Sequence, residues 1–66
     1  MKILINDEEI GFSGNTLIDL LAEHGFINSS GIAIAVNETV ISRDNWRSCN
    51  LKEGDSVLVM TPSQGG

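Results

Sequence analysis

The chain has 66 residues, 41% of them hydrophobic, and a formal net charge of −5. This length predicts one small domain with a thin core, with no room for a separate substrate domain. The negative charge argues against nucleic acid or an anionic membrane surface as a partner, because both require a basic face. No apolar run approaches the roughly 20 residues of a membrane span, and the N-terminus does not have the pattern of a signal peptide. We therefore expect a cytoplasmic protein.

The residue types that usually carry catalysis are sparse. Cys49 is the single cysteine, which excludes an internal disulfide and a cysteine-based zinc site. It lies in a polar stretch, and we expect a free structural thiol rather than a reactive one. His24, the single histidine, falls at the expected end of a helix, where a surface position is favoured by the helix dipole. The glycines do not form a phosphate-binding loop.

Two segments near the N-terminus alternate apolar with polar or small residues, as half-buried strands do. We expect strands at residues 2–6 and 9–13, joined into a hairpin by a short polar turn. The side chains predicted to face the core are Met1, Ile3, Ile5, Ile10 and Phe12.

A helix is predicted to follow. Thr16 and Asp19 have the spacing of a capping box, with Asp in the place of Glu. Apolar residues then recur at helical intervals, and Gly25 stands where a left-handed C-cap is expected. The residues at this spacing are Leu17, Leu20, Leu21 and His24.

The second half of the chain predicts more strands, at residues 32–37, 39–41 and 56–61. Between the last two, residues 43–46 predict a single helical turn with Trp46 as an apolar anchor. The element order β-β-α-β-β-β indicates an α+β fold. In it, one helix packs across one face of a small mixed sheet and the other face stays open to water.

The alternation in these strands predicts which residues point away from the helix. Ile34, Val36, Val57 and Val59 are assigned to the core. An exposed apolar patch, formed by Leu58, Met60, Ala33 and Ala35 with a contribution from Leu4, is predicted on the open face. We interpret this patch as a docking face for a partner protein.

The chain ends in Gly65-Gly66. Glycine has no Cβ and adopts backbone angles closed to other residues, so such a tail can enter a narrow channel in a partner. The six residues 61–66 can extend roughly 20 Å. We therefore predict a folded domain over residues 1–61 and a flexible tail over residues 62–66, with the Gly66 carboxylate as the reacting group.

Several stretches together are similar to a known family, namely residues 1–6, 16–17, 20–21, 36–38, 40–46, 51–55 and 65–66. The chain resembles the ubiquitin-like β-grasp sulfur carriers, and its spacing of Arg43 and Trp46 is typical of their thiamine-biosynthesis branch. It departs from that pattern at Ser42, where the family often has proline, and in a tail that carries Pro62 and little apolar character.

The resemblance implies a carrier that binds no cofactor and is not an enzyme. An adenylyltransferase would use ATP and magnesium to activate Gly66. A persulfide formed from cysteine by a desulfurase would then displace AMP, and a thiazole synthase would accept the sulfur from the resulting thiocarboxylate. Gly65 and Gln64 would shape the tail, the apolar patch would dock the partner, and Cys49 would not carry the sulfur. We expect the free carrier to be a monomer.

Three alternatives remain open from the sequence. The chain could carry sulfur for molybdopterin or cysteine synthesis. It could instead be a protein modifier that is joined through Gly66 to a lysine amine, which a covalent protein adduct would reveal. A third possibility is an interaction module with an inactive tail, whose function would survive deletion of Gly66.

Overall fold

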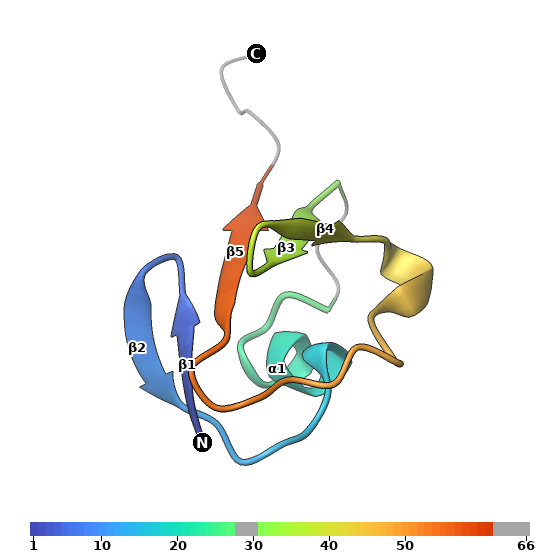
Figure 1. Ribbon diagram of the computed structural model, residues 1–66. Coiled ribbons are helices and arrows are strands. Elements are labelled where there is room, and N and C mark those ends of the chain that lie inside the picture. The colour runs from blue at the N-terminus through green and yellow to red at the C-terminus, as the bar shows by residue number, and fades with distance from the viewer. Residues whose placement is uncertain (28–30, 62–66) are drawn as a thin grey trace.

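The computed structural model describes residues 1–27 and 31–61, which form a mixed sheet covered on one face by a helix (Figure 1). Its strands are β1 (Lys2–Ile5), β2 (Glu8–Gly11), β3 (Ala33–Val36), β4 (Thr39–Ile41) and β5 (Ser56–Met60). The helix α1 spans Leu17–Glu23, and a 3₁₀ helix spans Arg43–Asn45. The predicted element order is confirmed, with boundaries that differ by one or two residues.

The strand order is β2-β1-β5-β3-β4, so the last strand among the described residues lies at the centre of the sheet. β5 runs parallel to β1 and antiparallel to β3, whereas the two outer pairings are antiparallel hairpins. The parallel register places Ile5 beside Val57. Every pairing that joins the two hairpins therefore passes through β5.

Both hairpins turn through pairs of residues with positive φ. Asn6 and Asp7 have φ values of 49° and 69°, and Asn37 and Glu38 have values of 50° and 72°. Two-residue turns of this hand match the twist of the flanking strands, and asparagine tolerates this conformation better than most residues.

Helix α1 begins with the predicted capping box. The Thr16 side chain accepts a hydrogen bond from the Asp19 amide at 3.3 Å, and the Asp19 carboxylate accepts one from the Thr16 amide at 3.3 Å. The helix ends at Glu23, with His24 as the C-cap and Gly25 at φ 80°. Within the described residues, no helix is long and apolar enough to cross a membrane.

The core lies between α1 and one face of the sheet. Leu17, Leu20 and Leu21 of the helix are buried against strand and loop residues that include Ile3, Phe12, Ile32, Ile34, Trp46, Leu51, Val57 and Val59. Ile5, Ile10 and Val36 are half-buried and pack against this cluster. The assignment of Met1 to the core is wrong, since its side chain is 40% exposed. Met1 precedes β1, and its backbone is held to Phe12 at the sheet edge by hydrogen bonds of 2.7 and 2.8 Å.

Candidate functional site

The site predicted from the sequence begins where β5 ends. Met60 is the last residue of β5, and Thr61, which is exposed, is the last residue that the structure describes (Figure 1). Gln64, Gly65 and Gly66 lie outside the described residues, as does the rest of the predicted tail. The described residues therefore show how the folded domain positions Thr61, the residue that precedes the predicted tail.

Two asparagine side chains, one from each hairpin turn, hold β5. The Asn37 side-chain oxygen accepts a hydrogen bond from the Ser56 amide at 3.0 Å, and its amide group donates to the Asp55 carboxylate at 3.0 Å. The Asn6 side-chain oxygen accepts from the Val59 amide at 2.9 Å. Both ends of β5 are thus bonded to turns as well as to neighbouring strands.

The face of the sheet opposite α1 carries the predicted patch. Leu58 is 46% exposed and Met60 is 36% exposed. In the antiparallel register Ala33 lies opposite Met60 and Ala35 lies opposite Leu58, and directly opposed residues share one face of a sheet. The predicted orientation of these four side chains agrees with this register.

The expected exposure of Ala35 is wrong, because only 6% of its surface is accessible. Ala35 lies between Leu58 on β5 and Val40 on β4 in the pairing register, and these larger neighbours cover its short side chain. Ala33 is half-buried. The two alanines therefore add little accessible area of their own.

One member of this face was not predicted from the alternation in the sequence. Val40 is 66% exposed and is paired with Ala35. Val40 is the middle residue of the three-residue strand β4 and is paired with Ala35, which faces away from the helix. This pairing shows that Val40 faces the same way, and the sequence alone does not give the pairing. We define the open-face patch as Leu58, Met60, Ala35 and Val40, with the half-buried Leu4 and Ala33 beside them.

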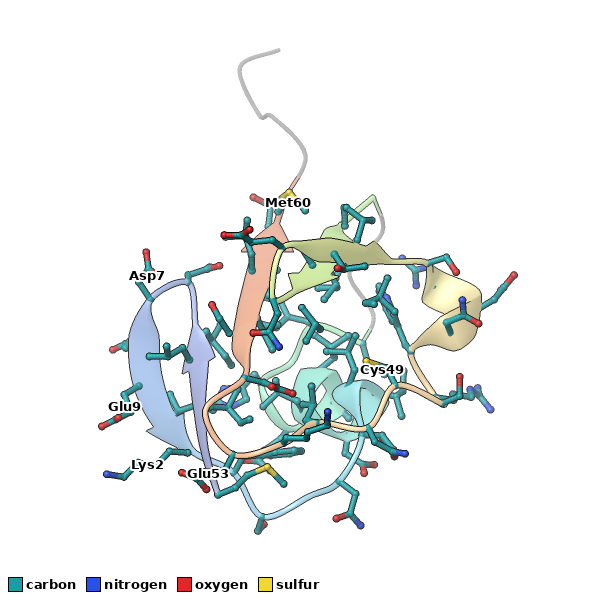
Figure 2. All side chains as sticks on the ribbon, viewed as in Figure 1. Lys2, Asp7, Glu9, Cys49, Glu53 and Met60 are labelled. Atoms are coloured by element: carbon teal, nitrogen blue, oxygen red, sulfur yellow. The ribbon has the colours of Figure 1, made fainter. Side chains whose placement is uncertain are left out.

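Cys49 lies apart from this patch. Figure 2 places Met60 at the end of β5 and Cys49 well away from it, and the Cys49 carbonyl accepts a hydrogen bond from the Leu17 amide at the start of α1. Burial raises the pKa of the Cys49 thiol, and the negative charge of Asp55 raises it further. Because the thiolate is the nucleophilic form, these surroundings disfavour reactivity.

The remaining candidates for chemistry are surface groups. His24 is exposed at the end of α1, and its Nε2 lies 3.9 Å from the neighbouring Glu23 carboxylate. Over residues 1–27 and 31–61, His, Cys, Asp and Glu side chains do not gather into a group of three that could hold a metal ion.

The chain is similar to proteins of a known family. Residues 3–66 match the ThiS family. The chain is 27% identical over 66 residues to the sulfur carrier protein ThiS of Escherichia coli strain K12, and the alignment covers 100% of both chains.

Two solved structures share the fold. A crystal structure of the thiamine biosynthesis protein ThiS from Geobacter metallireducens has a TM-score of 0.84 at 20% identity, with 100% of both chains covered. A solution structure of a thiamine biosynthesis protein from the same organism has a TM-score of 0.77 at 20% identity, covering 100% of this chain and 88% of the other. These similarities confirm the predicted ubiquitin-like β-grasp fold and the predicted resemblance.

Proposed function

The chain belongs to the ThiS family, and from this premise we propose that it carries sulfur for thiamine biosynthesis as a thiocarboxylate on Gly66. The family match carries the proposal, because it extends over residues 3–66 and so includes Gly65-Gly66. Membership makes the chain a small sulfur carrier protein that works with partner proteins. It favours the thiamine carrier over the molybdopterin, cysteine and protein-modifier alternatives.

The chemistry begins with activation of the Gly66 carboxylate. A carboxylate is a poor electrophile, so a partner adenylyltransferase, using ATP and magnesium, joins it to AMP and releases pyrophosphate. A sulfur donor, a persulfide derived from cysteine by a desulfurase, then attacks the activated carbonyl, and AMP leaves as an acyl disulfide forms between Gly66 and the donor. A second thiol attacks the donor-side sulfur of that S–S bond, which releases the thiocarboxylate on Gly66 and leaves a disulfide on the donor. The net change replaces one carboxylate oxygen with sulfur, and that oxygen leaves in AMP. A thiazole synthase accepts the sulfur.

The carrier is proposed to present Gly66 to the partner enzymes and not to catalyse a step itself. Leu58 and Met60 are exposed on the strand that leads into the tail, so a partner that covers the open-face patch receives the tail at the edge of the same contact. Gln64 and Gly65 are proposed to shape the tail that leads to Gly66. Apolar side chains at the centre of a contact commonly provide much of its binding energy.

The test is the intact mass of the carrier after incubation with the adenylyltransferase, ATP, magnesium, the sulfur donor and a thiol reductant. The expected product has sulfur in place of one oxygen, located at Gly66 by fragmentation. Deletion of Gly66 should leave the fold intact and abolish the mass change. An unchanged mass of the intact carrier, with an enzyme proven active on its own carrier, would refute the proposal.

Cys49→Ala is the matched control for the location of the sulfur. This variant keeps Gly66, so it should acquire sulfur to the same extent as the original chain. Loss of sulfur loading in Cys49→Ala, with the fold retained, would instead assign the sulfur to the thiol.

A further inference from the structure

A surface pocket of about 220 Å³ lies apart from the open-face patch. It is lined by Ile18 of α1, by Ile27, and by Arg43, Trp46 and Arg47 from the segment that follows β4. We call it the arginine pocket. None of these five residues belongs to the open-face patch.

The walls of the arginine pocket are held by hydrogen bonds. The Trp46 indole N–H donates to the Ile41 carbonyl at 3.0 Å, and the Ile18 amide donates to the Trp46 carbonyl at 3.1 Å. The Arg43 guanidinium lies over the Trp46 ring, 4.7 Å from its centroid. β4, the 3₁₀ segment and α1 are thereby tied together around the pocket, which is formed before a ligand arrives.

The charge of the arginine pocket is opposite to that of the protein. The chain has four basic residues against nine acidic ones, yet Arg43 and Arg47 both line this one pocket and the other lining residues are uncharged. Guanidinium groups bind carboxylates with paired hydrogen bonds. Ile18 and Ile27 beside them offer apolar surface, so the pocket suits a carboxylate joined to an aliphatic group.

A nucleotide fits this arrangement poorly. Base recognition commonly uses an exposed aromatic face for stacking. Trp46 is only 2% exposed and its ring already has Arg43 over it. The chemistry of the pocket therefore points to a protein side chain with a carboxylate rather than to a base.

We propose that the arginine pocket docks an acidic segment of a partner protein, with an Asp or Glu carboxylate on Arg47 and a neighbouring aliphatic side chain against Ile18 and Ile27. This inference rests on the proposed function, since the partner is one of the proteins that load or unload Gly66. Leu58 and Met60 do not line this pocket, so an acidic segment bound here leaves them accessible to another part of the partner. The carrier can then be held through one surface while its tail is engaged through another.

The experiment compares Arg47→Glu with Lys52→Glu. Both residues are exposed and both substitutions change the net charge equally, but Lys52 does not line the pocket. Dissociation constants are measured for the adenylyltransferase and for the thiazole synthase. Arg47→Glu should weaken binding to at least one of them by about tenfold, the scale of a charge pair lost from an interface. Lys52→Glu should change both constants far less.

Equal dissociation constants for Arg47→Glu and Lys52→Glu with both partners would overturn the proposal. Thermal melting first confirms that each variant is folded, and Arg47→Gln replaces Arg47→Glu if the reversed charge unfolds the chain. Arg47→Lys should recover part of the lost affinity.

Two further measurements separate this inference from its alternatives. Inorganic phosphate is titrated against the protein while the NMR signal of the Trp46 indole N–H is followed. Saturable binding that Arg47→Glu removes, without any effect of that variant on partner binding, would identify a free-anion site and overturn the protein-docking proposal. Sulfur loading of the unmodified carrier is measured in parallel, because its failure refutes the proposed function and not the docking site.

Discussion

Asn6 and Val59 are 53 positions apart in the sequence, yet the Asn6 side-chain oxygen accepts the Val59 amide hydrogen at 2.9 Å. The Asn6 backbone amide also donates to the Val57 carbonyl at 2.9 Å. Asn6 thus bonds β5 from beyond the end of β1, at the point where the chain turns away. The Asn6 side chain therefore continues the hydrogen bonding of β5 beyond the last residue of β1, toward the end of β5 where the candidate site begins.

The Asn6–Val59 bond predicts a loss of stability in Asn6→Gly. Glycine accepts the left-handed backbone at φ 49° but leaves the part-buried Val59 amide without its acceptor. The free energy of unfolding should fall by about 1–3 kcal/mol. The free energy of unfolding of Asn6→Ala should be lower than that of Asn6→Gly by about another 1 kcal/mol, because alanine is strained at positive φ. Urea unfolding measures both.

Asp7→Gly is the control for the Asn6 series. Asp7 is in the same turn at φ 69° and is exposed, so glycine suits its backbone. The Asp7→Gly variant should therefore keep the stability that Asn6→Gly loses. Hydrogen exchange at the Val59 amide gives a second measurement, and unchanged protection in Asn6→Gly would contradict the assigned role.

Gly14 and Gly11 form a matched pair for a second prediction. A Cβ added at Gly14 would lie 2.6 Å from the Phe12 ring and 3.0 Å from the Asp19 Cβ, whereas one added at Gly11 would meet no atom within 4 Å. Phe12 is a core residue and cannot shift without cost. Gly14→Ala should therefore destabilise the fold by about 1–3 kcal/mol, and Gly11→Ala should not. Thermal unfolding of the two variants, if it shows equal stability, would refute the packing argument.

The capping box predicts a dependence of stability on pH. The Thr16 backbone amide, then the Thr16 hydroxyl and the Asn15 amide, lower the pKa of Asp19 below its ordinary value of 3.8. A group with a lowered folded-state pKa stabilises the fold above its unfolded-state pKa and loses that contribution as the pH falls through the folded-state value. Asp19→Asn should therefore be less stable than the original chain at neutral pH.

The measurement is the free energy of unfolding of both chains from neutral pH to well below 3.8. The difference between them should shrink as the pH falls and Asp19 becomes protonated. A difference that stays constant over the whole range would show that the charge of Asp19 does not act through the cap.

The open-face patch predicts a loss of partner binding in Leu58→Glu. Leu58 is 46% exposed, so a charged side chain should be tolerated by the fold. Adenylation efficiency should fall by about tenfold or more, because a charge would be buried in the contact. Ser13→Glu adds the same charge on an exposed residue outside both the open-face patch and the arginine pocket, and it should keep the original efficiency. Equal rates for the two variants would remove Leu58 from the docking face.

Local patterns were sufficient for most of the elements. Four predicted features are present, namely the capping box at Thr16 and Asp19, the left-handed Gly25 after the helix, the strand at residues 39–41 and the buried anchor Trp46. Each depends on neighbours within a few residues, where spacing determines geometry. The family resemblance then supplied the fold.

The errors and omissions have a different origin. The exposure of Ala35 depends on Leu58 and Val40, which belong to other strands, and the bond from Asn6 to Val59 depends on the parallel pairing of the first and last strands. The arginine pocket likewise combines α1 with a segment 25 positions later, from Ile18 to Arg43. Such relationships follow from register and packing between distant segments, which periodicity alone does not encode.

The central place of β5 has a consequence for biosynthesis of the chain. The hairpin of β1 and β2 and the hairpin of β3 and β4 each pair internally, but the sheet is joined only when β5 enters between them. A nascent chain therefore cannot complete its sheet until its last strand has been synthesised, and long-range pairings of this kind form late. A chain cut short before Ser56 should remain unfolded and be open to proteolysis. A chain that has reached the native fold has therefore been translated through β5, the strand that leads to the segment ending in Gly66.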